Sequence, residues 1–368
     1  MGQKPDAAPS AKASFGKKLL LLLGTLVVIL TLLEVAMRVR MKMKYGRTGN
    51  EFYASEVHPA AGFRVPLPDQ EIGPLHINSH GFRGPELETP KPGGRVRIAF
   101  LGASTTFCAE ASSDEKTWPG QLIRMLSERF PMNEFDYVNG GIPGIGADES
   151  RRNLEYRIAP LQPDIMVIYH ATNDLSRDTR LLAEKQGLFT VKGDERSFLA
   201  RISVTWDLIE KNLKVRARTR AAMNEGDRLQ FDATELSAQY RQVLTRLVEK
   251  AKSLCDRVVV VTFSTRLRKE QSAEERLAAC NTSLLYMPYM TVDGLLAGFA
   301  AYNQVNREVA AATGSLLVDG EDSIPANEAM FKDSVHLSDL GCEKMAARIF
   351  SRLVEDPGFL EILRKRER

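Results

Sequence analysis

A serine, an aspartate and a histidine occupy positions that could support nucleophilic catalysis. Ser104 closely follows the apolar run Arg95–Gly102, and Asp333 precedes His336 by three residues. On a tight turn such a carboxylate can reach the ring Nδ1, and an oriented imidazole is the base that a serine nucleophile requires. The chain order Ser, Asp, His also occurs in α/β-hydrolases, although their G-x-S-x-G elbow is absent. Taken alone, Ser104 could equally be a helix N-cap.

Two further segments carry groups that could stabilise a developing negative charge. Four glycines lie between Gly140 and Gly146, which suits either a close approach of backbone N–H groups or a flexible turn. No G-x-G-x-x-G dinucleotide fingerprint is present. Asn173, in the segment His170–Asp174, could donate its side-chain amide to an oxyanion, and the alternative is an Asx turn.

The elements that must position these residues are five short apolar runs, each nearly continuous rather than alternating. They are Arg95–Gly102, Phe135–Gly141, Ile165–Ala171, Arg257–Ser264 and Ser315–Gly320. Such runs are typical of parallel strands that are covered on both faces. Helical patterns follow or separate them, at Trp118–Arg129, Glu149–Ile158, Leu236–Leu254, Leu295–Ala312 and Ser338–Val354. We therefore predict an α/β/α fold with a doubly wound, flavodoxin-like sheet of five parallel strands, and a site beyond its carboxyl edge.

Four blocks of this sequence, in order, resemble the SGNH (GDSL-like) hydrolase family over roughly residues 95–355. The matching residues are Gly102-Ala103-Ser104, Gly144 in Asn139–Gly144, Asn173 in Ala171–Asp174, and Asp333-Ser334-Val335-His336. The resemblance implies a catalytic triad of Ser104, Asp333 and His336. It also implies an oxyanion hole formed by the backbone N–H groups of Ser104 and Gly144 and by the Asn173 side chain. It implies neither a cofactor nor a metal.

The sequence departs from the family pattern at three positions. Ala103 and Thr105 stand where the named motif has Asp and Leu, and Ala171 stands where Gly is usual. The stretch Asn78–Gly84 resembles a segment found ahead of the domain in membrane-anchored relatives. We expect it to be a turn-forming surface loop.

The resemblance leaves three functions open. The first is a serine ester hydrolase, an esterase or deacetylase acting on an acylated small molecule, lipid or glycan. The second is an O-acyltransferase that uses the same triad, with a hydroxyl of a cell-envelope glycan in place of water. The third is a non-catalytic binding module that keeps the fold.

The N-terminal end differs in charge from the rest of the chain. The 368 residues carry a net charge of +3, but residues 1–44 carry +6 and the remainder −3. This distribution indicates a membrane surface at one end and argues against nucleic acid as a partner. Four widely spaced cysteines without a C-x-x-C pair exclude zinc ribbons, and we expect most of them to be buried free thiols.

Residues 19–37 form an apolar stretch with one charge, Glu34. At about 1.5 Å per residue it would span roughly 29 Å, close to the hydrocarbon thickness of a bilayer. A cleaved signal peptide is the rival interpretation, but no small-x-small cleavage site follows. We expect a single-pass signal anchor. Four basic residues precede it and five follow closely, so charge is almost balanced and leans, if anything, toward a cytoplasmic body, while the resemblance implies an extracytoplasmic catalytic domain.

The expected organisation runs from a basic tail of cytoplasmic type to a charged C-terminal tail. Its segments are the basic tail 1–18, anchor 19–37, linker or strap 38–93, hydrolase domain 94–356 with a helical insertion 178–232, and C-terminal tail 357–368. The insertion could be a lid over the site or a solvated helical excursion.

Overall fold

The computed structural model describes residues 11–45, 53–188, 196–222 and 228–367. The chain divides into two units. One comprises Met1–Phe52 and Asp194–Lys211, and the other comprises Tyr53–Gly193 and Asn212–Arg368. The second unit contains the central sheet and every predicted site residue.

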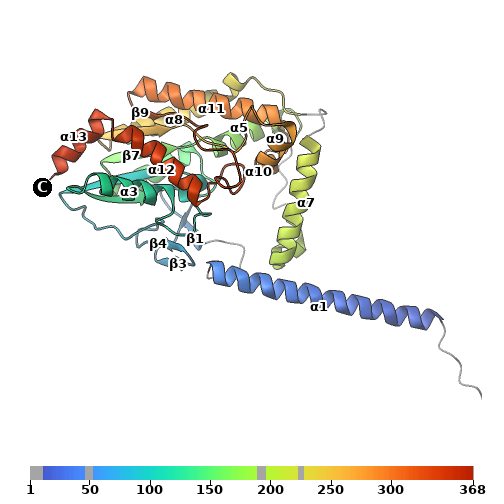
Figure 1. Ribbon diagram of the computed structural model, residues 1–368. Coiled ribbons are helices and arrows are strands. Elements are labelled where there is room, and N and C mark those ends of the chain that lie inside the picture. The colour runs from blue at the N-terminus through green and yellow to red at the C-terminus, as the bar shows by residue number, and fades with distance from the viewer. Residues whose placement is uncertain (1–10, 46–52, 189–195, 223–227, 368) are drawn as a thin grey trace, which may run out of the picture. The chain divides into compact units, whose positions relative to one another are not determined.

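A five-stranded parallel sheet forms the centre of this unit (Figure 1). Its strands are β5 (Arg95–Gly102), β6 (Glu134–Asn139), β7 (Ile165–Tyr169), β8 (Arg257–Val261) and β9 (Leu316–Val318). They lie in the order β6-β5-β7-β8-β9, and each neighbouring pair is parallel. The predicted flavodoxin-like sheet is confirmed. The strands are almost wholly buried, which explains why they read as continuous apolar runs.

Helices cover both faces of the sheet (Figure 1). Helices α3 (Trp118–Arg129) and α12 (Asp339–Leu353) pack against each other on one face, and the other carries α4 (Ala147–Asn153), α5 (Thr172–Lys185), α8 (Ala233–Lys252) and α11 (Val292–Thr313). Polar side chains begin four of them. Thr117, Asp232, Thr291 and Ser338 each accept a hydrogen bond from a backbone N–H in the first helical turn.

Several expected boundaries differ from the observed elements. Helix α4 continues as a π-helix over Leu154–Ile158 and a 3-10 turn over Ala159–Leu161. The expected insertion start at Asp178 falls inside α5, whose Thr179 and Ala183 are buried. The insertion contains α6 (Phe198–Ile202) and α7 (Val204–Ala222). Two short helices that periodicity did not indicate, α9 (Ala273–Ala279) and α10 (Asn281–Tyr286), precede α11.

The C-terminal segment, expected as a charged tail, is a helix that belongs to the core. Helix α13 covers Pro357–Arg366, and Asp356 caps its first turn. Its apolar residues Phe359, Ile362 and Leu363 are buried, while the basic residues that suggested a tail lie in the last turn. Basic side chains in the last turn are stabilised by the negative end of the helix dipole.

The strap expected over 38–93 begins inside helix α1 (Ala11–Tyr45), and its described part from Tyr53 on contains two small hairpins ahead of the domain. They pair β1 (Ser55–Val57) with β2 (Arg64–Pro66), and β3 (Gln70–Ile72) with β4 (Leu75–Ile77). The stretch Asn78–Gly84 does turn, but the expected surface position is wrong, because Phe82 and Arg83 are 3% and 2% exposed. Arg83 also bridges to Asn139 at the end of β6.

The N-terminal unit contains one long helix, α1, over Ala11–Tyr45. Within the described residues it is the one helix long and apolar enough to cross a membrane, over Phe15–Met43. Residues 1–10 of the expected basic tail lie outside the described residues. All four cysteines are free, and Cys108, Cys280 and Cys342 are buried, as expected for structural thiols.

Candidate active site

A sharp turn between β5 and the short helix α2 (Ser104–Phe107) presents Ser104. The turn depends on Gly102, because a Cβ there would lie 1.9 Å from Oγ1 of Thr106 and 2.9 Å from the carbonyl oxygen of Tyr169. Ser104 is the first residue of α2, so its backbone N–H has no acceptor within the helix. The turn therefore exposes both a hydroxyl and a free N–H at the carboxyl edge of the sheet.

The predicted serine, histidine and aspartate lie in direct contact. Oγ of Ser104 is 2.8 Å from Nε2 of His336, and Nδ1 of His336 is 2.8 Å from Oδ2 of Asp333. The other carboxylate oxygen of Asp333 accepts the backbone N–H groups of Val335 and His336, at 2.9 and 2.8 Å. These bonds hold the carboxylate in one orientation and leave Oδ2 facing the ring.

The pair Asp333–His336 is electrostatically coupled. Burial disfavours the imidazolium, but the hydrogen bond and charge of Asp333 outweigh it and raise the pKa of His336 above its ordinary value of 6.5. Burial likewise opposes ionisation of Asp333, and the bonds from His336 and the backbone lower its pKa below the usual value. The Asp333 carboxylate thus stays ionised. Its charge stabilises the protonated form of the His336 ring, which lies next to the Ser104 hydroxyl.

The predicted oxyanion residues line the same cavity as Ser104 and His336. This cavity of about 460 Å³ includes Gly144 and Asn173 in its wall. Gly144 has φ +88°, a left-handed conformation that favours glycine and turns the loop after β6 at this point. The side-chain amide of Asn173 donates one hydrogen to the carbonyl of Ile145, at 2.8 Å. Its second hydrogen remains for a ligand in the cavity.

The departure at Ala171 leaves the position of Asn173 intact. Ala171 has φ −175°, extended backbone that any residue adopts, so a glycine is not required there. Its neighbour His170 is buried, with Nε2 2.7 Å from Oγ of Ser150, and burial lowers its pKa to about 4. Burial raises the pKa of Asp174, which accepts the N–H of Ala147, to about 7. Between about pH 4 and pH 7, His170 and Asp174 are therefore both mostly uncharged. They support the loop beside Gly144 without adding much charge to it.

The loop that carries Asp333 and His336 is held by residues that sequence reasoning missed. The hydroxyl of Ser334, between them, accepts the backbone N–H groups of Thr282 and Ser283 in α10, at 3.1 and 3.2 Å. Its carbonyl accepts the N–H of Arg266, at 2.9 Å. A buried serine inside a D-x-x-H block gives no periodic signal, so only its contacts reveal the role.

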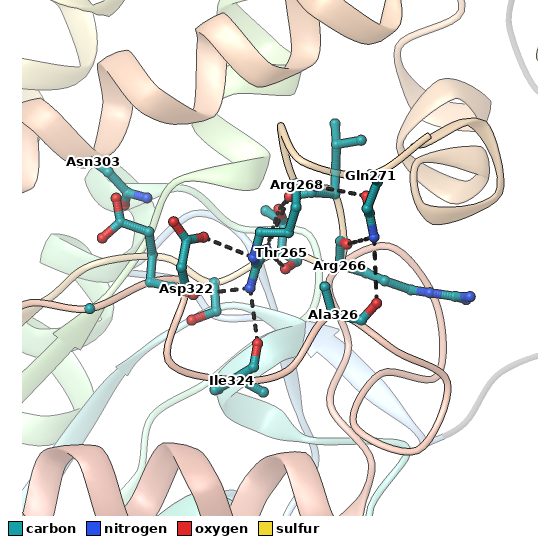
Figure 2. Close-up of polar contacts among 12 residues, drawn as sticks. Thr265, Arg266, Arg268, Gln271, Asn303, Asp322, Ile324 and Ala326 are labelled. Atoms are coloured by element: carbon teal, nitrogen blue, oxygen red, sulfur yellow. Dashed lines mark hydrogen bonds and ion pairs between the residues drawn. The ribbon is translucent and has the colours of Figure 1, made fainter. Parts of the chain in front are cut away.

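A second set of contacts braces the segment leading to this loop (Figure 2). The guanidinium of Arg268, after β8, contacts Asp322 at 2.8 Å and donates to the carbonyls of Ile324, at 3.0 Å, and of Thr265. Gln271 accepts the N–H of Arg268, at 2.8 Å, and donates to the carbonyl of Ala326. The loop after β8 is thereby tied to the one that follows β9 and runs on to Asp333.

The strap supports the serine turn from the other side. The buried guanidinium of Arg83 contacts Asp114 at 2.7 Å and donates to the carbonyls of Phe107, at 2.9 Å, and of Cys108. These carbonyls end the helix that Ser104 begins, and a cation is favoured at that end. The side-chain amide of Asn139 donates to the carbonyl of the preceding residue, Thr106, at 3.1 Å. The resemblance marked the stretch around Arg83 but indicated no role for it.

Other possible sites are separate from this arrangement. A cavity of about 710 Å³ lies between α5 and α8 and contains neither Ser104 nor His336. Within the described residues no group of three or more His, Cys, Asp or Glu side chains is placed to hold a metal ion.

The site joins a hydroxyl, an imidazole and a carboxylate in a chain of contacts, and donors for an oxyanion lie beside them at the carboxyl edge of a doubly wound sheet. This arrangement is typical of serine hydrolases. The family model described as "GDSL-like Lipase/Acylhydrolase family" matches residues 100–344. The chain belongs to this family of SGNH hydrolases and is an enzyme that hydrolyses ester bonds.

Comparison with other proteins adds two structural likenesses. An acetylxylan esterase from Geobacillus stearothermophilus is 18% identical, with 70% of this chain and 93% of that chain covered at a TM-score of 0.43. An α/β hydrolase enzyme from the metagenome of Lake Arreo, Spain, is 15% identical, with 70% and 94% covered at a TM-score of 0.42. A comparison with curated proteins found no match.

Proposed function

We propose that this chain is a membrane-anchored serine esterase that works through an acyl-enzyme formed on Ser104. The observation that carries the proposal is the continuous contact from Ser104 through His336 to Asp333, at 2.8 Å for each step, within one cavity. The substrate is an acylated small molecule, lipid or glycan.

The first half-reaction acylates the serine. His336 Nε2 takes the proton of the Ser104 hydroxyl as Oγ attacks the ester carbonyl, and the tetrahedral oxyanion receives hydrogen bonds. Its donors are the N–H groups of Ser104 and Gly144 and the amide of Asn173, each worth on the order of 2.7–4 kcal/mol in the transition state. The imidazolium then protonates the leaving alcohol as the C–O bond breaks. Asp333 stabilises the imidazolium and remains ionised.

The second half-reaction releases the acid. His336 takes a proton from water, the hydroxide attacks the acyl-enzyme through the same oxyanion site, and Ser104 leaves with the proton returned by His336. An acceptor alcohol in place of water would give acyl transfer by the same steps. Products measured with and without an acceptor distinguish the two, and acyl groups appearing on the acceptor faster than free acid would contradict hydrolysis as the main reaction.

The decisive experiment compares wild type with Ser104→Ala on a small activated ester, together with labelling by a fluorophosphonate. We expect the variant to lose labelling and to fall to the residual rate of the oxyanion site alone. Hydrolysis at the wild-type rate by a folded Ser104→Ala protein would refute the assignment. Absence of labelling in folded wild type would favour a binding module.

We also propose that α1 anchors the enzyme in a membrane with the catalytic domain extracytoplasmic. The proposal is supported by the 29-residue candidate span Phe15–Met43, whose predominantly apolar stretch is long enough to cross a bilayer. A compartment-sensitive reporter fused to the C-terminus tests the orientation, and activity of a cytoplasmic reporter would overturn it. A mature protein that begins after residue 37 would instead show that α1 is a cleaved signal sequence.

A further inference from the structure

The insertion contains a cluster of exposed apolar side chains. This part of the insertion contacts helix α1, although the two segments are far apart in the sequence. Six large hydrophobic residues within α6 and the first turns of α7 are each at least 37% exposed. They are Phe198, Leu199, Ile202, Trp206, Leu208 and Ile209, which we call the insertion patch. Single exposed hydrophobic residues are ordinary, but six within twelve positions require a covering surface.

Glu34 of α1 binds the beginning of α7. Its Oε2 accepts the Ser203 hydroxyl at 2.8 Å and the N–H of Thr205 at 3.0 Å, and its Oε1 accepts the N–H of Val204 at 3.1 Å. A carboxylate is favoured at this end of a helix because the first N–H groups have no partner in the helix and the dipole is positive there. The one acidic residue of the apolar stretch is thus satisfied by the insertion.

Arg38, one turn further along α1, completes the contact. Its Nε donates to Glu34 at 2.7 Å, and its Nη2 donates to the carbonyl of Ile202, the last residue of α6, at 2.8 Å. Two residues of α1 thereby hold both sides of the junction between α6 and α7. Both segments belong to the same unit of the structure, so this contact does not depend on how the two units are arranged.

The position of Glu34 in α1 sets the depth of this junction in the membrane. Glu34 lies three residues before Met37, the end of the apolar stretch, which corresponds to about 4.5 Å along the helix axis. An ionised carboxylate at that depth is costly unless it is paired, and the α7 N-terminus, Ser203 and Arg38 supply the pairing. The insertion patch flanks the junction on both sides in the chain, so an α1 that spans the bilayer would bring it to the boundary between headgroups and acyl chains.

We propose that residues 198–209 are a second membrane-contacting element, bound to the anchor through Glu34 and covered by lipid. This inference rests on the proposal that α1 spans a membrane. The depth of the junction matches the interfacial layer that amphipathic segments occupy, about 5–10 Å into the headgroup and acyl boundary, and Trp206 is the residue type enriched there. The insertion then serves to attach the enzyme to the bilayer rather than to cover the active site.

Trp206 provides a natural probe of this contact. The chain has two tryptophans, and the other, Trp118, is fully buried at the start of α3. Full-length protein is reconstituted into phosphatidylcholine–phosphatidylglycerol vesicles whose acyl chains carry bromine at a shallow or a deep carbon. Trp206→Phe supplies the background from Trp118. We expect shallow bromines to quench the Trp206 emission and deep bromines to quench it clearly less, as for an interfacial side chain.

Two variants of α1 test the link to the anchor. Glu34→Ala removes the acceptor of the Ser203, Val204 and Thr205 bonds, and we expect it to reduce the quenching of Trp206. Val35→Ala changes a neighbouring exposed residue that makes none of these bonds, and we expect it to leave the quenching unchanged. Equal quenching in Glu34→Ala and wild type would overturn the role of Glu34.

Flotation of the vesicles separates this inference from the anchor itself. Protein that floats with the vesicles while Trp206 escapes bromine quenching would overturn the inference and leave the anchor standing. Concentration-dependent crosslinking through the insertion patch, without quenching, would show that a second copy covers it instead. Protein that does not float would overturn the anchor and the inference together.

Discussion

Ser104 Oγ and His336 Nε2 lie 2.8 Å apart, although 232 positions of the chain separate the two residues. The contact is made by two loops that leave the carboxyl edge of the sheet at β5 and beyond β9. His336 is held from its other side by Asp333, so the ring has one orientation and one favoured tautomer.

Activity should depend on the protonation of His336. The ring must be neutral to accept the Ser104 proton, and Asp333 raises the pKa of His336 above 6.5. We therefore expect kcat/KM to increase with pH through a midpoint above 6.5. Asp333→Asn removes the charge that raises this pKa, so the midpoint should move to lower pH while kcat falls on the order of 10⁴-fold. A variant with an unmoved midpoint would contradict the coupling.

Asn173 should act mainly in the transition state. Asn173→Ala removes a donor aimed at the oxyanion, and we expect kcat to fall by about 10²–10³-fold with little change in KM. The variant also loses the bond to the Ile145 carbonyl, so its melting temperature is measured beside its kinetics. A higher KM with unchanged kcat would show instead that Asn173 only binds substrate.

The brace at Arg268 should position the catalytic loop without touching the substrate. Arg268→Gln loses the bonds to Asp322 and the Ile324 carbonyl, which lets the segment before Asp333 shift. We expect kcat to fall roughly 10–100-fold, the scale of a 1 Å misplacement, while the pH midpoint stays in place. Arg124→Gln, which breaks an exposed ion pair on α3, is the matched control and should have wild-type kinetics.

Arg83 should stabilise the folded protein through its contacts with the serine turn. Arg83→Ala would leave the Asp114 carboxylate without its ion-pair partner and remove the guanidinium bonds to the Phe107 and Cys108 carbonyls, at a cost on the order of 3 kcal/mol in the free energy of unfolding. Arg83→Lys keeps the charge but loses the planar fork, and we expect an intermediate loss. Chemical denaturation measures both, and a Lys variant as stable as wild type would show that charge alone suffices.

The charge of the cavity should favour anionic esters. None of the described residues lining it is acidic, while Arg177 and Arg180 both line it. Arg177 is paired with Glu149 at 2.8 Å, whereas Arg180 is exposed and has no ion-pair partner among the described residues. Arg180 lies on the same face of α5 as Asn173, seven residues further along.

We expect Arg180→Gln to lower kcat/KM about tenfold, or ~1.4 kcal/mol, for an acetyl ester that carries a carboxylate or phosphate. Hydrolysis of a neutral acetyl ester should change little, and added salt should reduce the wild-type preference. Equal losses on both esters would exclude charge recognition by Arg180.

Local patterns predicted much of the fold. Strand β5 and helix α3 begin and end where their apolar runs and helical spacing indicated, because burial on one or both faces leaves a periodic trace in the sequence. Helix α13 was missed because its last turn is basic and its buried face is short. Helices α9 and α10 were missed because helices of six or seven residues show too few turns for a period to appear.

The sequence by itself determined the order of the strands, the chemistry available after each one, and an apolar N-terminal stretch. These are local properties, since residue type and spacing report which groups are buried and which are reactive. Only the tertiary structure decided that Arg83 supports the serine turn and that Arg268 and Ser334 hold the histidine loop. It also decided that Glu34 accepts hydrogen bonds from the start of α7. Each joins segments distant in the chain, and such contacts depend on how elements pack, which leaves no periodic trace in either segment.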